Sequence, residues 1–395
     1  MWFSVKLIQM TDDLHNRLER KVNDMEKIIK LHPAICAVGR NYQIMIVTEC
    51  DALVSARVGE KTYFSQSNGI KKSLAGVHCI IVDMETLDKE KSYVLVLQKI
   101  IERSPYFPTS EPPVEKKYTF RPIEKTNGIN IYHLADVHGE YERAINAAKY
   151  AGGDYDLLIL NGDIADSTET FEDLILCYKI ASALTGGEYP CVISRGNHDM
   201  RGAGAEKLSD VMPTLNGKTY YTFKIGCIWG MVVDAGEDKD DSREEYGGTI
   251  CCHDFRVVQE KMIENVIEHR HEEYLASDVT YRIVISHMPF TFRDRPPFDI
   301  ERELYKKWGQ LVQNNIKPSF MLCGHTHRAT VSHYKTGGDK EQGFPIVVGA
   351  ETRLSETNDA IVLFAGAKIT LDNKVANVTV NTGSETIFEQ CVELM

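Results

Sequence analysis

The chain has 395 residues, of which 43% are hydrophobic and 26% are charged, and its formal net charge is −12. This length predicts two domains, or three small ones, with the composition of an ordinary globular protein. The acidic balance argues against binding to duplex nucleic acid, because no broad basic face would neutralise the phosphates. The ten cysteines are scattered without a C-x-x-C pair, which indicates reduced thiols that are mostly buried.

The N-terminal residues show no targeting or membrane signal. No apolar run reaches membrane-spanning length, and MWFSVKLIQMTDDLHNRL lacks the apolar core and small-residue cleavage site of a secretory signal. The sequence therefore predicts a cytoplasmic protein, with export by a signal outside this sequence as the open alternative. Apolar residues at helical spacing predict a packing helix over residues 12–31, with Pro33 beyond its end.

Residues 34–104 alternate between apolar and polar in the manner of strands. The expected strands are YQIMIVTE, ALVSARVG, KTYFSQ, HCIIVDM and SYVLVLQKI, which together predict a small β-sandwich. The order of these strands resembles the fibronectin-like N-terminal domain of purple-acid-phosphatase-type proteins. We therefore expect a first domain over residues 1–104, a proline-rich linker over 105–127, and a second domain over 128–395.

Five segments of the second domain begin as apolar runs and end in polar side chains that bind metals. They are INIYHLADVHGEY (129–141), DLLILNGDIADS (156–167), CVISRGNHDM (191–200), RIVISHMPF (282–290) and FMLCGHTHRA (320–329). Each begins like a buried parallel strand and then gives way to Asp or His. Because loops at the carboxyl ends of such strands converge on one crevice, we expect these side chains to meet there.

The polar residues of these segments form one set of candidate metal ligands: Asp136, His138, Asp163, Asn197, His287, His325 and His327. Carboxylate, imidazole and amide donors suit hard-to-borderline divalent ions, and seven donors are too many for one tetrahedral zinc. Two ions that share Asp163 as a bridging carboxylate would use them all. In D-x-H and H-x-H the two ligands lie on the same side of an extended segment, so both can reach the site.

The motif set D-x-H, G-D-x-x-D, G-N-H-D, a lone His after an aliphatic strand, and G-H-x-H resembles the calcineurin-like metallophosphoesterase superfamily. The resemblance covers roughly residues 128–350. It implies two metal ions with Asp163 in common. One would be held by Asp136, His138, Asp163 and His327, and the other by Asp163, Asn197, His287 and His325.

The resemblance also implies that His198 is catalytic and that Asp166 orients it. Purple acid phosphatases carry a tyrosine at the place of Asp166 and lack a histidine at the place of His138. We therefore expect two divalent ions (manganese, iron, zinc or similar) rather than a coloured ferric centre.

Helices are expected between and after the ligand segments. The stretches 140–151, 172–185, 257–274 and 301–315 read as helices. Residues 217–234 read as an antiparallel hairpin followed by a further strand, and the chain from 345 onward reads as strands. Alternation of strand and helix predicts right-handed βαβ units. The expected fold is α/β, a four-layer α-β-β-α sandwich preceded by a small β-sandwich domain.

These residues predict a dinuclear metal-dependent phosphoesterase that hydrolyses phosphomonoesters or phosphodiesters by attack of metal-bound hydroxide. His198 would protonate the leaving oxygen or stabilise the phosphoryl oxygens, and the alternative is a loop histidine bonded to the backbone. Asn197 and Arg201 are the candidate substrate-binding residues, although Arg201 equally suits a solvated loop. The acidic segment 237–245 is expected at the entrance.

Two other classes of function compete with this hypothesis. A non-catalytic scaffold on the same fold has no physical reason to retain every ligand together with His198. A metal-dependent nuclease would need a basic, aromatic-lined groove, which the acidic composition does not support. The expected partner is a small phosphorylated substrate, with its identity, the native metals and the oligomeric state left open.

Overall fold

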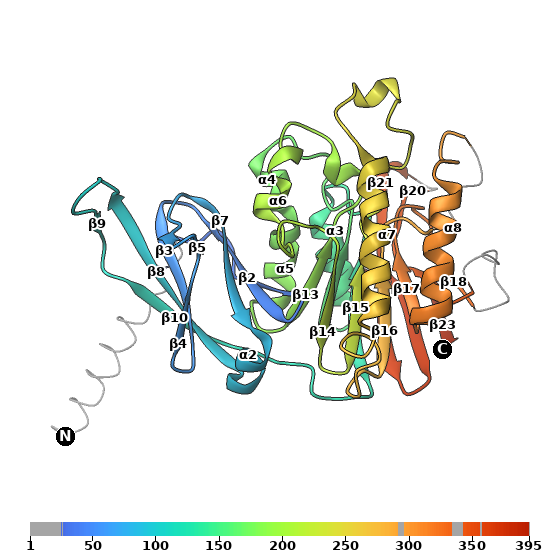
Figure 1. Cartoon of the computed structure of the whole chain (residues 1–395), viewed down its shortest axis with the longest axis horizontal. Helices are drawn as coiled ribbons and strands as arrows, with labels where there is room; N and C mark the ends of the chain where they lie inside the picture. Colours follow the sequence, from blue (N-terminus) through green and yellow to red (C-terminus); the bar gives the residue numbers. More distant parts are fainter. Residues whose placement is uncertain (1–24, 26, 291–295, 334–342, 356–357, 395) are drawn as a thin grey trace.

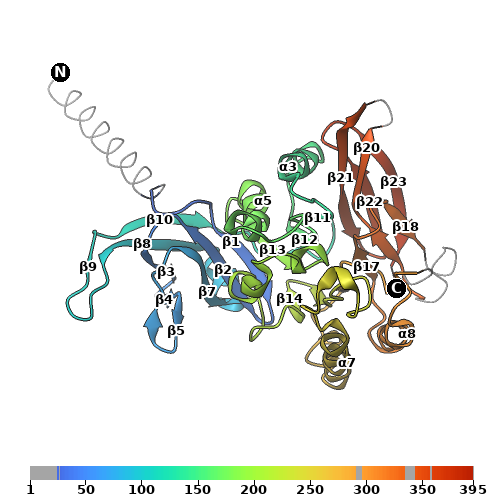
Figure 2. The same cartoon turned by 90° about the horizontal axis from the view of Figure 1, so that it is seen from above.

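Two large sheets lie face to face, with helices on their outer surfaces (Figures 1 and 2). The computed structural model describes residue 25 and residues 27–290, 296–333, 343–355 and 358–394. The helix predicted over residues 12–31 lies largely outside these residues. Among the described helices, none combines the length and the apolar composition needed to cross a membrane.

The first sheet has ten strands: β1 (Ala34–Val38), β2 (Asn41–Thr48), β7 (Gly76–Asp83), β11 (Ile129–Leu134), β12 (Leu157–Asn161), β13 (Pro190–Ser194), β20 (Glu351–Ser355), β21 (Asn358–Asp372), β22 (Val375–Asn381) and β23 (Thr386–Glu393). Their order is β23-β22-β21-β11-β12-β13-β1-β2-β7, with β20 paired to β21. The central strands β11, β12 and β13 are parallel, in the registers Ile131↔Leu157 and Leu158↔Cys191.

The second sheet has six strands: β14 (Tyr221–Ile225), β15 (Ile228–Val232), β16 (Tyr281–Ile285), β17 (Phe320–Cys323), β18 (Thr330–Ser332) and β19 (Ile346–Val348). They lie in the order β14-β15-β16-β17-β19-β18. Strands β15, β16, β17 and β19 are parallel neighbours. The antiparallel pair β14–β15 is the hairpin predicted over residues 217–234.

The longer helices are α3 (Tyr141–Tyr150) and α5 (Leu176–Thr185) beside the first sheet, and α7 (Cys252–Glu268) and α8 (Arg302–Leu311) beside the second. All four fall within or close to stretches predicted as helices, although α7 begins five residues before the expected 257. The shorter helical segments are α2 (Met84–Glu90), α4 (Phe171–Leu174), η1 (His198–Met200), η2 (Ala205–Lys207), α6 (Leu208–Val211), η3 (Glu244–Tyr246) and η4 (Val312–Ile316).

Alternation along β16 shows how the layers are built. Ile283 and Ile285 belong to the apolar core shared by the two sheets, whereas Val284 belongs to a separate core with Ile263 of α7 and Trp308 of α8. Successive side chains of a strand point to opposite faces, so each strand of this sheet separates two apolar layers. The predicted α-β-β-α order is therefore confirmed.

The N-terminal β-rich region is present, and one of its layers continues the first sheet. Strand β1 pairs in parallel with β13 at Cys36↔Cys191, and β2 and β7 follow it as antiparallel strands. No strand was predicted over residues 34–38, yet all five are buried. A strand that is buried on both faces reads as a short apolar run rather than as an alternating one.

The other layer of this region is a small sheet built from β3 (Ala52–Val58), β4 (Lys61–Phe64), β8 (Ser92–Glu102), β9 (Thr109–Ser110) and β10 (Val114–Thr119), with the short pair β5 (Gln66–Ser67) and β6 (Ile70–Lys71) nearby. Strand β10 lies within the predicted linker over 105–127. It pairs with β8 at Tyr118↔Tyr93, and these two rings stack 5.0 Å apart. The expected domain boundaries stay predictions, but this part of the linker is a strand.

We expect a chain that begins at Val114 to misfold, because it lacks the three strands that continue the first sheet beyond β13. That edge would expose unpaired backbone groups and the apolar residues that β1 covers. Circular dichroism and size-exclusion chromatography of the truncated chain, beside the full chain, would measure this. A soluble monomer that unfolds cooperatively would show instead that the N-terminal region is an independent domain.

Candidate metal centre

The seven predicted ligands meet at one edge of the two sheets. They follow the carboxyl ends of β11 (Asp136, His138), β12 (Asp163), β13 (Asn197), β16 (His287) and β17 (His325, His327). In three groups of residues the ligand atoms lie within 4.8 Å of one another. Two groups consist of candidate ligands: Asp136, His138 and His327 in the first, and Asp163, His287 and His325 in the second. The third combines His138 with Asp166 and His198. Asn197 joins the second group, since its Oδ1 lies 3.0 Å from Nδ1 of His325.

Five of the seven candidate ligands adopt a left-handed backbone conformation. Their φ angles are 52° at Asp136, 44° at His138, 50° at Asp163, 68° at His325 and 53° at His327. A residue with a Cβ atom is strained in this region by roughly 1–2 kcal/mol. Such strain is typical of functional sites, where the surrounding structure enforces the conformation. These turns direct the side chains out of the strands and into the crevice.

The glycines of the ligand motifs are required by close packing around these turns. A Cβ atom on Gly162 would lie 2.6 Å from the backbone nitrogen of Gly196, and one on Gly324 would lie 2.6 Å from Oδ2 of Asp136. A Cβ atom on Gly196 would collide with the carboxylate of Asp163. The residues before Asp163, Asn197 and His325 must therefore lack a side chain so that the loops of both sheets can approach.

His287 has the hydrogen-bonding pattern of a metal ligand. Its Nδ1 donates to the main-chain oxygen of Asn161 at 2.7 Å, which leaves Nε2 with the lone pair in the neutral ring. Nε2 is buried and makes no hydrogen bond, although it lies 3.0 Å from Oδ2 of Asp163. Metal-bound histidines characteristically donate their other nitrogen to a carbonyl in this way. The donor set therefore fits a divalent cation.

The other group is arranged similarly around His138. Its Nδ1 lies 3.1 Å from Oδ1 of Asp166, and its Nε2 lies 3.1 Å from Nε2 of His327. Nε2 of His327 is also 3.4 Å from Oδ1 of Asp136. Nitrogen and oxygen donors thus face one another at short range, as ligands of a common cation do.

Burial and charge perturb the titration of these groups. Burial, together with repulsion from Asp163, raises the pKa of Asp136 to about 7. Burial opposes the charged form of Asp163 as well, but His287 outweighs it and holds the pKa of Asp163 below its usual value. The same attraction raises the pKa of His287 to about 10 against the effect of burial. Two buried carboxylates therefore demand positive charge, which a proton or a divalent cation would supply.

Asp199 also belongs to this site, although sequence reasoning did not assign it a role. Its buried Oδ2 accepts hydrogen bonds from the backbone nitrogens of Asp163 at 2.9 Å and Gly196 at 2.8 Å. It thereby fastens the loop that carries Asn197 to the loop that carries Asp163. The only signal in the sequence is its position at the end of the G-N-H-D motif.

His198 lies against the ligand cluster, but the contact predicted for it differs in kind. Its backbone nitrogen donates to Oδ1 of Asp163 at 2.8 Å, and its ring lies 4.6 Å from that of His138. Nδ1 of His198 donates to the main-chain oxygen of Asp166 at 2.8 Å, whereas the Asp166 carboxylate is 3.5 Å away. The carboxylate, which is 76% exposed, lies closer to His138. Asp166 therefore holds His198 through its backbone.

Arg201 is not a free surface arginine. Its guanidinium donates to both carboxylate oxygens of Glu237, at 2.7 and 2.8 Å, and its Nη1 donates to Nε2 of His198 at 2.9 Å. The segment expected at the entrance is therefore partly internal, since Glu237 is fully buried and Asp238 is 5% exposed. Oδ2 of Asp238 also lies 3.8 Å from Nε2 of His325. Sequence reasoning missed these two carboxylates because an acidic run ordinarily indicates a solvated surface.

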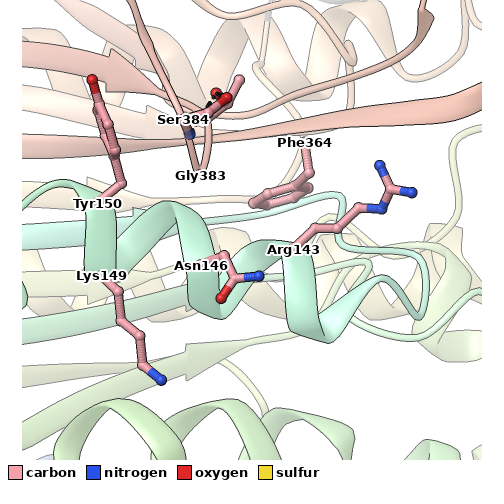
Figure 3. A pocket seen from close by; sticks show the side chains of 8 residues that line it. Arg143, Asn146, Lys149, Tyr150, Phe364, Gly383 and Ser384 are labelled. Carbon is pink, nitrogen blue, oxygen red and sulfur yellow. Dashed lines mark hydrogen bonds between the residues drawn. The ribbon is translucent and has the colours of Figure 1, made fainter.

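A surface hollow of about 550 Å³ lies apart from the ligands (Figure 3). It is lined by Arg143, Asn146, Lys149, Tyr150, Phe364, Thr382, Gly383 and Ser384. None of the seven candidate ligands lines it, and Figure 3 shows the side chain of Lys149 pointing away from the turn at Gly383 and Ser384. The hollow is therefore separate from the centre of the expected chemistry.

The chain belongs to the calcineurin-like phosphoesterase family, whose model matches residues 129–329, more than half of the chain. The match spans every segment that carries a candidate ligand. A search of curated proteins found no match.

The solved structures that are similar to this chain include the following two. One is a purple acid phosphatase, PPD1, from the seeds of yellow lupin (Lupinus luteus), with 12% identity, a TM-score of 0.56, and coverage of 92% of this chain and 74% of that chain. The other is PhoD, with 10% identity, a TM-score of 0.52, and coverage of 93% of this chain and 89% of that chain. At these identities the likeness is one of fold.

If Asp163 is the shared ligand, Asp163→Asn should remove both ions and Asp136→Asn should mainly weaken one. Oδ2 of Asp163 lies 3.0 Å from Nε2 of His287 and 3.9 Å from Nε2 of His138, which belong to different groups. Oδ1 of Asp136 likewise lies 3.7 Å from Nε2 of His287 and 3.4 Å from Nε2 of His327, so a comparison of the two variants decides which carboxylate bridges. Elemental analysis of metal-saturated, desalted protein would measure the ions retained per chain, with the exposed Asp154→Asn as a matched control. Equal partial losses in the two variants would contradict a bridging role for Asp163.

Proposed function

We propose that this chain is a dinuclear metal-dependent phosphoesterase that hydrolyses phosphomonoesters or phosphodiesters of small molecules. The observation that supports this most strongly is the convergence of carboxylate and imidazole donors from both sheets, with the buried Nε2 of His287 3.0 Å from Oδ2 of Asp163. Membership in the calcineurin-like phosphoesterase family supports the reaction class.

In this proposal Asp136, His138, Asp163 and His327 hold one ion, and Asp163, Asn197, His287 and His325 hold the other. The seven candidate donors are oxygen and nitrogen atoms, which suit manganese, iron or zinc. When bound, two such ions supply Lewis acidity that activates water and neutralises charge on the phosphoryl group. Asn197 would serve both as a ligand and as a contact to the substrate.

His198 is the candidate for the group that assists the leaving oxygen. Its ring lies beside His138, but its Nε2 accepts a hydrogen bond from Arg201, so this nitrogen carries no proton in the neutral ring. To act as an acid, Nε2 must first take up a proton. It must also break its hydrogen bond with Arg201 and donate a new one to the ester oxygen. Otherwise His198 and Arg201 together would hold a phosphoryl oxygen.

A substrate screen tests this function against its alternatives. The full chain, stripped of metal and then reconstituted with manganese, would be assayed on alkyl and aryl phosphomonoesters, phosphodiesters and single-stranded oligonucleotides. Metal-dependent hydrolysis of small esters is the expected result. Activity on oligonucleotides alone would identify a nuclease, and a metal-replete chain that is inactive on every ester would indicate a scaffold.

His198→Ala should lose more activity on poor leaving groups than on good ones. An alkyl alkoxide needs a proton, whereas p-nitrophenolate is already stable as an anion. General acid catalysis is typically worth about a hundredfold to ten-thousandfold, so a loss of that order is expected on alkyl esters and a smaller one on p-nitrophenyl esters. The measurement is kcat/KM for both substrates in metal-replete protein.

Asp166→Asn is the matched comparison for this prediction. Because Asp166 contacts His198 through its main-chain oxygen, this variant should keep the leaving-group selectivity of the wild type. Equal losses on both substrates in His198→Ala would exclude the acid role and favour binding of a phosphoryl oxygen.

A further inference from the structure

The contact between Glu237 and Arg201 fixes the direction of a guanidinium group beside the candidate centre. Nε and Nη2 of Arg201 donate to the two oxygens of one carboxylate, at 2.7 and 2.8 Å. A bidentate pair of this kind holds the planar group in one orientation, which a single contact does not. Burial of Glu237 also excludes the water that would otherwise compete for these bonds.

Glu237 is itself held by several independent contacts. Its Oε2 accepts a hydrogen bond from the hydroxyl of Tyr246 at 3.0 Å. Its backbone oxygen accepts one from Nη2 of Arg256, and its backbone nitrogen donates to Sγ of Cys252 at 3.4 Å. Because Cys252 and Arg256 both belong to α7, the carboxylate is anchored to the helical layer rather than to a free loop.

Arg201 uses this fixed orientation to contact His198. A carbonyl oxygen can only accept, so Nδ1 of His198, 2.8 Å from the main-chain oxygen of Asp166, carries the ring proton. A guanidinium can only donate, so Nε2 of His198, 2.9 Å from Nη1 of Arg201, presents its lone pair. The two partners together select one tautomer and one ring orientation.

We propose that Glu237 is a positioning residue for His198 and acts through Arg201. Glu237 holds the guanidinium, the guanidinium holds Nε2, and the ring stays in the Nδ1-protonated tautomer against the ligand cluster. The structural part of this proposal concerns only the resting state, and its kinetic consequence rests on the proposed function. A carboxylate that merely tied its segment to the body of the protein would leave the imidazole unchanged when neutralised.

Nitrogen-15 NMR of histidine-labelled, zinc-loaded full chain tests the resting state directly. The His198 signals would be identified by their loss in His198→Gln. In the wild type we expect the protonated shift at Nδ1 and the unprotonated shift at Nε2. A wild-type ring protonated at Nε2 would overturn the proposal without any need for a Glu237 variant.

Glu237→Gln then tests the positioning role, because it keeps the shape but removes the charge that orients Arg201. We expect the His198 signals to move toward a mixture of tautomers, and kcat to fall about tenfold to a hundredfold with KM nearly unchanged, as for a misplaced catalytic group. Glu245→Gln is the matched control, since Glu245 pairs with Lys239 at 2.9 Å on the same segment. This control should match the wild type in both measurements.

Folding and function are separated by two further observations. Thermal unfolding and metal content would show whether Glu237→Gln retains the native fold. Arg201→Lys replaces the planar guanidinium with a single amine, so we expect it to cause the same loss of tautomer selection. Unchanged His198 signals in a folded Glu237→Gln would refute the proposal. If no ester is hydrolysed by any form while the signals shift as expected, the proposed function fails and the positioning role stands.

Discussion

The candidate centre depends on hydrogen bonds that join the two sheets at Asn161. This fully buried residue at the end of β12 accepts a hydrogen bond at its main-chain oxygen from His287, and its side-chain nitrogen donates to the main-chain oxygen of Leu322 at 3.1 Å. The core between the sheets is otherwise largely apolar, and apolar contacts alone tolerate sliding. Hydrogen bonds in such an environment are directional and costly to break, so they align the ligands of both sheets.

Without a bound cation, the residues of this centre lower the free energy of unfolding. Asp136 and Asp163 are both buried, and both have a left-handed backbone. Repulsion between the carboxylates and strain in the turns each oppose folding. A cation bound only by the folded state would offset these costs, because its binding free energy adds to the free energy of unfolding. Metal affinity and stability are therefore expected to be linked in this protein.

The charge distribution explains how an acidic chain can suit an anionic substrate. The net charge of −12 belongs to the whole molecule, whereas binding depends on the field at the crevice. There the buried carboxylates would be neutralised by metal ions, while the charge of Arg201 is offset by Glu237, which fixes the direction of the guanidinium donors. With metal ions bound as proposed, such a small site would suit a compact phosphate ester better than an extended nucleic acid.

The sequence by itself determined the set of candidate ligands and the alternation of strand and helix, because both are local. Apolar runs predict the strands before Asp136 and Asp163, and the polar residues that follow them are candidate ligands because the loops converge. It did not determine that β1 continues the first sheet, that the carboxylate of Asp166 lies closer to His138 than to His198, or that Glu237 is buried beneath Arg201. These features join residues far apart in the chain, and their partners are chosen by how the layers pack. Only the tertiary structure, which brings α7 and the ligand loops together, could decide them.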